Sequence, residues 1–181
     1  MTKITISGTP GSGKSVIAEK LCKEFNLKYY DLGKLMRKAA ESRNISLEEL
    51  REVRKKDDSI DKDLDNEMKR IGIEEDDFVF VGRVAYHFIP DSIKLYFKCT
   101  IEEGAKRILG HSDESRKVES FSNIQEAIDK LIARQKVDEH LYFDLYGLNP
   151  FDESNYDLVI DTTNLNVEEV FAKVLEFIKN N

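Results

Sequence analysis

The chain has 181 residues, enough for one domain with a sizeable hydrophobic core. A composition of 40% hydrophobic and 35% charged residues is typical of a soluble globular protein and excludes an intrinsically disordered chain. The net charge of −7 argues against nucleic-acid binding, and no apolar run approaches membrane-spanning length. We therefore expect a cytoplasmic, monomeric protein with no nucleic-acid and no membrane partner.

Five short apolar segments predict strands. The first, third and fifth are nearly continuous hydrophobic runs, which suits parallel strands that are covered on both faces. The predicted strands are residues 3–7, 28–31, 78–82, 93–98 and 157–161.

Helical patterns separate these strands, and several begin with a capping motif. Ser46, Thr100, Ser122 and Asn166 each stand three residues before Glu or Gln, which is the pattern of an N-terminal capping box. Gly147 is expected to end the long helix that follows Ser122. The predicted helices are residues 15–25, 32–42, a segment that begins after Ser46, 60–71, 100–109, 122–146 and a C-terminal segment after Asn166.

Strand and helix alternate, so the sequence predicts an α/β fold with a parallel sheet. Two intervals are longer than a simple crossover connection. Residues 33–76 insert several helices, and residues 110–122 form a polar stretch between two helices. Because ligands bind at the carboxyl ends of the strands in such a sheet, we expect both insertions to close over a ligand as lids.

The stretch Gly8-x-x-x-x-Gly13-Lys14-Ser15 lies between a predicted strand and an amphipathic helix, and it predicts a phosphate-binding loop, or P-loop. Glycines let several backbone N–H groups point inward, and the following helix adds its positive end. Lys14 is expected to reach the β- and γ-phosphates, and the Ser15 hydroxyl to bind Mg²⁺. A chance Gly-rich turn is the alternative, and the loop alone does not name the reaction. The predicted nucleotide-binding residues are Gly8, Thr9, Pro10, Gly11, Ser12, Gly13, Lys14, Ser15 and Val16.

Further motifs resemble those of nucleoside monophosphate kinases. The segment DLGKLMR, residues 31–37, looks like their Gly-x-x-x-Arg turn, with Gly33 and Arg37 in the matching positions. The segment VGR, residues 81–83, is similar to their second phosphate-gripping turn, and EEGAKRI places Arg107 at the position of a lid arginine.

The long-helix segment ARQKVDEHLYFDLYG and the segment YDLVIDT point, within that superfamily, to cytidylate kinases, in particular the short archaeal-type and cytidylate-kinase-like forms. The resemblance covers essentially the whole chain. It implies an α/β fold of the P-loop nucleoside triphosphate hydrolase type, a three-layer sandwich around a five-stranded parallel sheet of order 2-3-1-4-5. It also implies one kinase domain, residues 1–181, with a monophosphate-binding insertion at 33–76 and a lid at 110–122.

The resemblance further implies an ATP- and Mg²⁺-dependent transferase of pyrimidine nucleotide metabolism, a kinase that phosphorylates CMP or dCMP. The acceptor is already an anionic phosphate oxygen, so alignment and charge neutralisation suffice without a general base. The implied catalytic residues are Lys14, Arg37, Arg83, Arg107 and Arg134, with Arg107 also on the donor nucleotide. The implied acceptor-binding residues are Gly33, Arg37, Asp61, Arg83, Arg134 and Asp138, and the implied metal-binding residues are Ser15 and Asp31.

Four positions depart from the family pattern. Val81 stands where many members have an acid that orients Mg²⁺ through water. His111 and Leu141 stand where arginines are expected, and Leu32 stands where bacterial members have a base-contacting serine. Each replacement of a charged residue removes one charge from the closed site.

The residues leave three alternatives to this interpretation. The acceptor could be another nucleotide or a small hydroxyl compound, for which Asp31 would be the candidate base. The protein could be a weakly active nucleotide-binding regulator. The individual residues also have plain structural interpretations: Arg134 and Asp138 as a helical ion pair, and Asp61 and Asp65 as a solvated helix face.

Overall fold

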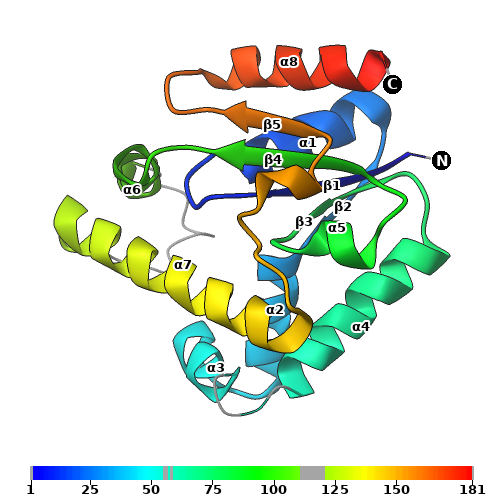
Figure 1. Cartoon of the computed structure of the whole chain (residues 1–181). Coiled ribbons are helices and arrows are strands. Elements are labelled where there is room, and N and C mark those ends of the chain that lie inside the picture. Colours follow the sequence, from blue (N-terminus) through cyan, green and yellow to red (C-terminus); the bar gives the residue numbers. More distant parts are fainter. Residues whose placement is uncertain (1, 55–56, 58, 111–120, 181) are drawn as a thin grey trace. The chain divides into compact units, whose positions relative to one another are not determined.

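The computed structural model describes residues 2–54, 57, 59–110 and 121–180, and Figure 1 traces the chain with its elements labelled. These residues form two compact units. The first takes the chain up to Ser7 together with Ala18–Lys94, and the second takes Gly8–Ile17 together with the chain from Leu95 onward. The predicted insertion at 33–76 belongs to the first unit. Most of the predicted lid, residues 111–120, lies outside the described residues.

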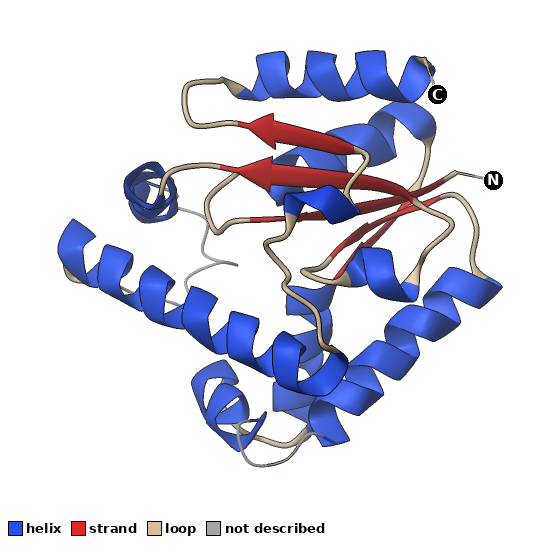
Figure 2. Ribbon diagram, in the orientation of Figure 1, coloured by secondary structure: helices blue, strands red, loops and turns tan. Residues whose placement is uncertain are grey.

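The strands of the described chain form one five-stranded parallel sheet of order β2-β3-β1-β4-β5; they are labelled in Figure 1 and drawn in red in Figure 2. This order, with helices flanking the sheet, confirms the predicted α/β class and the predicted topology. The strands agree with the predicted segments to within one residue at each end. They are β1 (Lys3–Gly8), β2 (Lys28–Asp31), β3 (Phe78–Val81), β4 (Ile93–Lys98) and β5 (Leu158–Asp161).

The register of the strands decides which loops leave the sheet together. In the first unit Val81 pairs with both Ile6 and Asp31, so the segments that follow β2 and β3 leave the same edge at the same level. In the second unit Lys98 pairs with Asp161, so Cys99 and Thr162 leave the sheet side by side. Residues far apart in sequence therefore meet at the carboxyl ends of these strands.

The predicted helices all form; α2 has the predicted bounds, and other helices begin or end a few residues away from the predicted positions. Two short elements, α5 and η2, were not predicted because three or four residues carry too little periodic pattern. The helices are α1 (Lys14–Phe25), α2 (Leu32–Ser42), α3 (Leu47–Arg54), α4 (Ser59–Glu74), α5 (Ala85–Phe88), α6 (Ile101–Gly110), α7 (Ile124–Tyr146) and α8 (Val167–Lys179), with the 3₁₀ helix η2 (Glu153–Asn155).

Helix ends confirm most of the capping predictions. Asn166 and Glu169 form a complete capping box at α8, and Ser46 and Glu49 exchange the same pair of hydrogen bonds before α3. Before α6 only half of the box forms, because the Glu103 carboxylate pairs with the Arg107 guanidinium instead.

The predicted start of α7 is wrong by one residue. Its N-cap is Asn123, whose side chain accepts a hydrogen bond from the Glu126 amide at 2.9 Å. The backbone N–H of Ser122 donates to the Glu126 carboxylate at 2.8 Å. A carboxylate accepts these bonds more strongly than the Gln125 amide would, which moves the cap along by one position. The other end was predicted correctly: Gly147 adopts φ +67° and closes the helix.

Each unit has its own hydrophobic core. In the first, α2, α3 and α4 contact one another, and the buried side chains of Leu50, Met68 and Ile71 are almost fully shielded from solvent. In the second, Ala105 of α6 packs on Ala127 and Leu131 of α7. Within the ranges that the structure describes, no helix is both long and apolar enough to span a bilayer.

Candidate active site

The P-loop, residues 8–15, has a backbone that depends on glycine. Gly8, Gly11 and Gly13 have φ values of +141°, +76° and +86°, a region that other residues rarely adopt. A Cβ placed on Gly8 would lie 1.8 Å from the carbonyl oxygen of Phe97, so no side chain fits there. The loop therefore has the conformational freedom that an anion-binding nest of N–H groups requires.

Lys14 and Ser15, the last two residues of the P-loop, form the start of α1. The Lys14 ammonium donates hydrogen bonds to the carbonyl oxygens of Thr9 at 2.6 Å and Gly8 at 3.1 Å. A positive charge is thus held over the loop, next to the positive end of a twelve-residue helix. Two sources of positive charge at one loop favour binding of a polyanion.

The P-loop backbone packs directly against helix α6. A Cβ on Gly104 would lie 2.5 Å from the Pro10 carbonyl oxygen, and a Cβ on Gly11 would lie 2.4 Å from the Gly104 Cα. Two glycines are therefore needed for this approach. Sequence reasoning missed Gly104, although an isolated glycine inside a helical pattern often marks a close contact.

Arg107, also on α6, contacts the backbone of the P-loop, and its role toward a nucleotide stays a prediction. Its Nη1 donates to the Gly11 carbonyl at 3.4 Å and to Thr162 Oγ1 at 3.1 Å, and its Nε donates to the Glu103 carboxylate at 2.9 Å. Its Nη2 donates to the carbonyls of Thr162 and Thr163. Each of its five N–H groups thus has a protein acceptor among the described residues.

Two further residues that sequence reasoning missed, Cys99 and Thr162, anchor the loop from the ends of β4 and β5. The Cys99 amide donates to Thr9 Oγ1 at 3.0 Å, and its thiol lies 3.6 Å from the Pro10 carbonyl. Burial is the main cause that raises the pKa of this thiol, so it stays protonated near neutral pH and packs as an apolar group. Each anchor contacts a P-loop residue more than 80 positions away, so the local sequence around Cys99 or Thr162 does not predict the contact.

The predicted acceptor residues at the end of β2 are organised around Asp31. Its carboxylate caps α2 by accepting from the Lys34 amide at 2.8 Å and also accepts from the Tyr29 hydroxyl at 3.0 Å. A Cβ on Gly33 would lie 2.9 Å from that carboxylate and 3.6 Å from Arg37 Nη1. The glycine therefore leaves room for the Arg37 guanidinium to lie over the first turn of α2.

The turn that carries Arg83, after β3, is held by a buried serine that sequence reasoning also missed. Ser7 Oγ lies 2.6 Å from the Gly82 carbonyl and 2.9 Å from the Arg83 carbonyl, and donates its proton to either. The Gly82 amide donates to the Ile6 carbonyl at 3.1 Å. Val81 just before this turn is buried in the sheet.

Asp61 and Asp65 lie on α4 and are 4% and 5% exposed, so the alternative of a solvated helix face is wrong. Arg54 from α3 donates to Asp61 Oδ1 from both Nε and Nη2, with an Nε–Oδ1 distance of 2.9 Å. The pKa of Asp65 is raised to about 7, first because burial disfavours its charged form and second because Asp61 lies nearby. This group is a buried ionic cluster inside the predicted monophosphate-binding insertion.

The remaining predicted residues lie on α7. Arg134 and Asp138 are half-buried and one helical turn apart, and Leu141 is half-buried as well. His111 lies outside the described residues. The roles given to these residues stay predictions.

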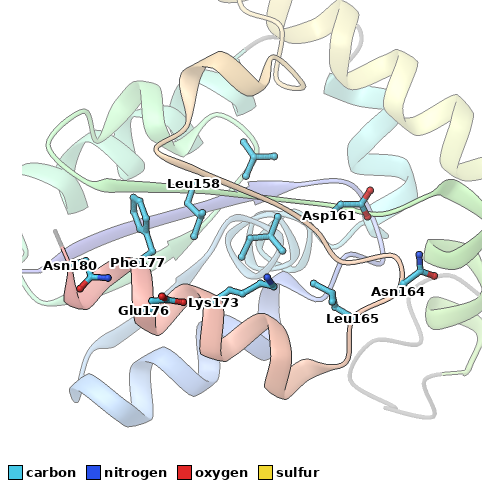
Figure 3. Close-up of a pocket in the computed structure, with 10 residues that line it drawn as sticks. Leu158, Asp161, Asn164, Leu165, Lys173, Glu176, Phe177 and Asn180 are labelled. Atoms are coloured by element: carbon cyan, nitrogen blue, oxygen red, sulfur yellow. The ribbon is translucent and has the colours of Figure 1, made fainter.

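A pocket of about 690 Å³ is lined by residues of β5, of α8 and of the loop between them (Figure 3). Figure 3 shows Leu158 and Asp161 of β5 and Lys173 and Phe177 of α8 around it. None of the predicted site residues lines this pocket. It is therefore separate from the residues assigned to the reaction.

The two predicted metal-binding residues, Ser15 and Asp31, both carry oxygen donors of the kind that Mg²⁺ prefers. Mg²⁺ usually takes one or two protein oxygens and completes its shell with phosphates and water. The Ser15 hydroxyl at the start of α1 can supply such an oxygen. The Asp31 carboxylate already accepts two hydrogen bonds, so it is the weaker of the two predicted ligands.

Comparisons with known proteins agree with this picture. The model of the cytidylate kinase-like family matches residues 3–164. A cytidylate kinase of Methanopyrus kandleri is 33% identical over 93% of this chain and 89% of its own length. A cytidylate kinase of Sulfurisphaera tokodaii is 33% identical over 96% of this chain and 92% of its own length. Among solved structures, a shikimate kinase from Bacteroides thetaiotaomicron has a TM-score of 0.68 at 12% identity, covering 98% of both chains, which is a likeness of fold.

Proposed function

The chain belongs to the cytidylate kinase-like family, and from this premise we propose that it transfers the γ-phosphoryl group of ATP to CMP or dCMP. The observation that carries the proposal is the P-loop, in which three positive-φ glycines precede Lys14 at the start of a helix. The names of the relatives support the choice of a cytidine nucleotide as the acceptor.

On the donor side, Lys14 is the residue that binds the β- and γ-phosphates of ATP. Its ammonium now donates to the carbonyls of Gly8 and Thr9. When ATP binds, it exchanges these neutral acceptors for β- and γ-phosphate oxygens, which accept more strongly because they are charged. The P-loop N–H groups hold the β-phosphate while the bond from the β–γ bridging oxygen to the γ-phosphorus breaks.

On the acceptor side, Arg37 and Arg83 hold the phosphate of CMP, and Arg134 adds a third positive charge. The planar guanidinium binds two phosphate oxygens at once, which fixes the direction of the attacking oxygen. That oxygen is anionic, so it forms the new bond to the γ-phosphorus without losing a proton. Positioning and charge neutralisation supply the rate enhancement.

For the metal, we assign the Ser15 hydroxyl as the protein ligand, and we leave Asp31 to its role as the N-cap of α2. Mg²⁺ bound there would neutralise part of the charge on the β- and γ-phosphates. This assignment is consistent with Val81, because a metal held mainly by the nucleotide does not need an acid at that position.

The test is a coupled assay of ADP release with ATP, Mg²⁺ and each of CMP, dCMP, UMP, AMP and GMP. We expect kcat/KM for CMP or dCMP to exceed the values for the other nucleotides by at least about tenfold. Lys14→Ala should abolish transfer, whereas Lys23→Ala, an exposed change in the last turn of the same helix, should not alter it. ATP binding without transfer to any monophosphate would overturn the proposal.

A further inference from the structure

Thr162, the residue after β5, is a buried polar contact point for the P-loop. Its side chain is 1% exposed. Its hydroxyl lies 3.2 Å from the Ser12 carbonyl and 3.1 Å from the Lys98 carbonyl, and donates its single proton to either. It accepts from Arg107 Nη1 at 3.1 Å. One hydroxyl thus joins the P-loop, the end of β4 and helix α6.

The position of Thr162 itself is fixed by the backbone. Its amide donates to the Lys98 carbonyl at 2.7 Å, and its carbonyl accepts from Arg107 Nη2 at the same distance. The hydroxyl therefore does not move with the loop that it contacts. It is a rigid reference point for the P-loop.

The bond to the Ser12 carbonyl has a geometric consequence for the next residue. In a planar trans peptide the C=O and the N–H point in opposite directions. When the Ser12 carbonyl points toward Thr162, the Gly13 N–H must point away from it. No described atom lies within 4 Å of a Cβ placed on Gly13, so the loop is open at this residue.

The preceding peptide is held in a similar way. The Gly11 carbonyl accepts from Arg107 Nη1 at 3.4 Å, and the Ser12 side chain, itself 2% exposed, is fixed by donation to the Thr9 carbonyl at 2.8 Å. Two successive carbonyls are therefore held by protein donors. Orienting backbone N–H groups before the ligand arrives reduces the cost of binding it.

We propose that Thr162 is a positioning residue for phosphate binding: its hydroxyl fixes the Ser12–Gly13 peptide so that the Gly13 N–H faces the triphosphate. The inference rests on the proposed function to the extent that the ligand is ATP. Arg107 acts beside Thr162 as the holder of the Gly11 carbonyl.

The test compares Thr162→Val, which removes the hydroxyl at nearly constant volume, with Thr162→Ser, which keeps it. We expect Thr162→Val to raise the Kd and KM for ATP by about tenfold, as for one lost charge-assisted hydrogen bond. KM for CMP should stay as in the wild type, and Thr162→Ser should bind ATP within about twofold of the wild type. ATP affinity is measured by titration calorimetry well below the melting temperature of each variant.

The matched control is Thr163→Val in the same loop. The Thr163 hydroxyl donates to Asp161 Oδ1 at 2.6 Å and accepts from the Thr100 amide, and neither contact is with the P-loop. The Thr163→Val variant should therefore bind ATP with the affinity of the wild type. If Thr162→Val destabilises the protein, the amide resonance of Gly13 in the folded state, with and without inorganic triphosphate, provides the second readout.

Wild-type ATP affinity in Thr162→Val, or an equal loss in Thr162→Ser, would overturn the inference. If only Thr162→Val loses ATP affinity, and the wild type binds ATP but phosphorylates no nucleoside monophosphate, the inference is supported. The same result would refute the proposed acceptor. Failure of the wild type to bind ATP would overturn both.

Discussion

Replacing Gly104 with alanine tests whether the P-loop is shaped by helix α6. The added Cβ would lie 2.5 Å from the Pro10 carbonyl oxygen, whereas an ordinary contact begins at 3.4 Å. The obstructing atom belongs to the backbone, so no side-chain rotation relieves the overlap. Either the loop or the helix must move.

The magnitude follows from two opposing effects. Alanine favours the helix over glycine by about 1 kcal/mol. Overpacking in a rigid contact costs about 1–3 kcal/mol. We therefore expect a net loss of up to about 2 kcal/mol in the free energy of unfolding. The larger effect is on function, because a misplacement of about 1 Å in a positioned site can lower the rate about 100-fold.

The assay measures the Kd for ATP, kcat/KM for ATP and the free energy of unfolding in urea, with Gly110→Ala as the control. Gly110 is the last residue of the same helix, and an added Cβ there meets no described atom within 4 Å. We expect weaker ATP binding and lower kcat/KM only in Gly104→Ala. If that variant keeps wild-type ATP affinity and activity, the contact between α6 and Pro10 does not shape the loop.

Three further predictions concern stability. Arg54→Ala should lower the free energy of unfolding in urea by about 3–5 kcal/mol, because it leaves the Asp61 carboxylate buried without its partner; a loss below about 1 kcal/mol would contradict this reading. The pKa of Asp65 is raised to about 7 from 3.8, so its protonated form is favoured in the folded state and stability should fall as the pH rises from about 4 through 7. Urea unfolding at several pH values measures this slope, and Asp65→Asn should reduce it; an equal slope in the variant would exclude Asp65 as its source. Asn166→Ala removes the capping box of α8 and should cost about 1 kcal/mol in the same assay, whereas no loss would show that the cap is dispensable.

The sequence was sufficient to assign helices and strands wherever the pattern lies within one short segment. Residues 28–31 and 32–42 were assigned correctly as strand and helix, because a short apolar run and helical spacing can each be recognised within a single segment. The strand order came from the resemblance and not from the pattern, since periodicity alone does not say which strands are neighbours. The start of α7 was misplaced because Ser122 and Asn123 both suit an N-cap, and the choice depends on which acid lies within reach.

For the candidate site, the sequence led to a prediction of the charged residues but not of the residues that support the P-loop and the turn before Arg83. Lys14 belongs to the P-loop motif, and the arginines were proposed because their short segments resemble motifs of nucleoside monophosphate kinases. Ser7, Gly104 and Thr162 act through contacts with partners between 55 and 150 positions away in the chain. A serine, a threonine or a glycine does not show in the local sequence that it makes such a contact. Asp61 was ambiguous for the same reason, because its burial depends on Arg54 of a different helix.

The anchoring of the P-loop by later segments has a consequence for synthesis. Residues 8–15 leave the ribosome early, but Thr9 bonds to Cys99, Gly11 to Arg107 and Ser12 to Thr162, with separations of 90, 96 and 150 residues. Contacts over such separations form late, because the entropy of closing long loops must be overcome first. A nascent chain that stops short of Cys99 would therefore carry the complete P-loop sequence without these three anchoring groups, and one that stops short of Thr162 would still lack the hydroxyl that contacts the Ser12 carbonyl.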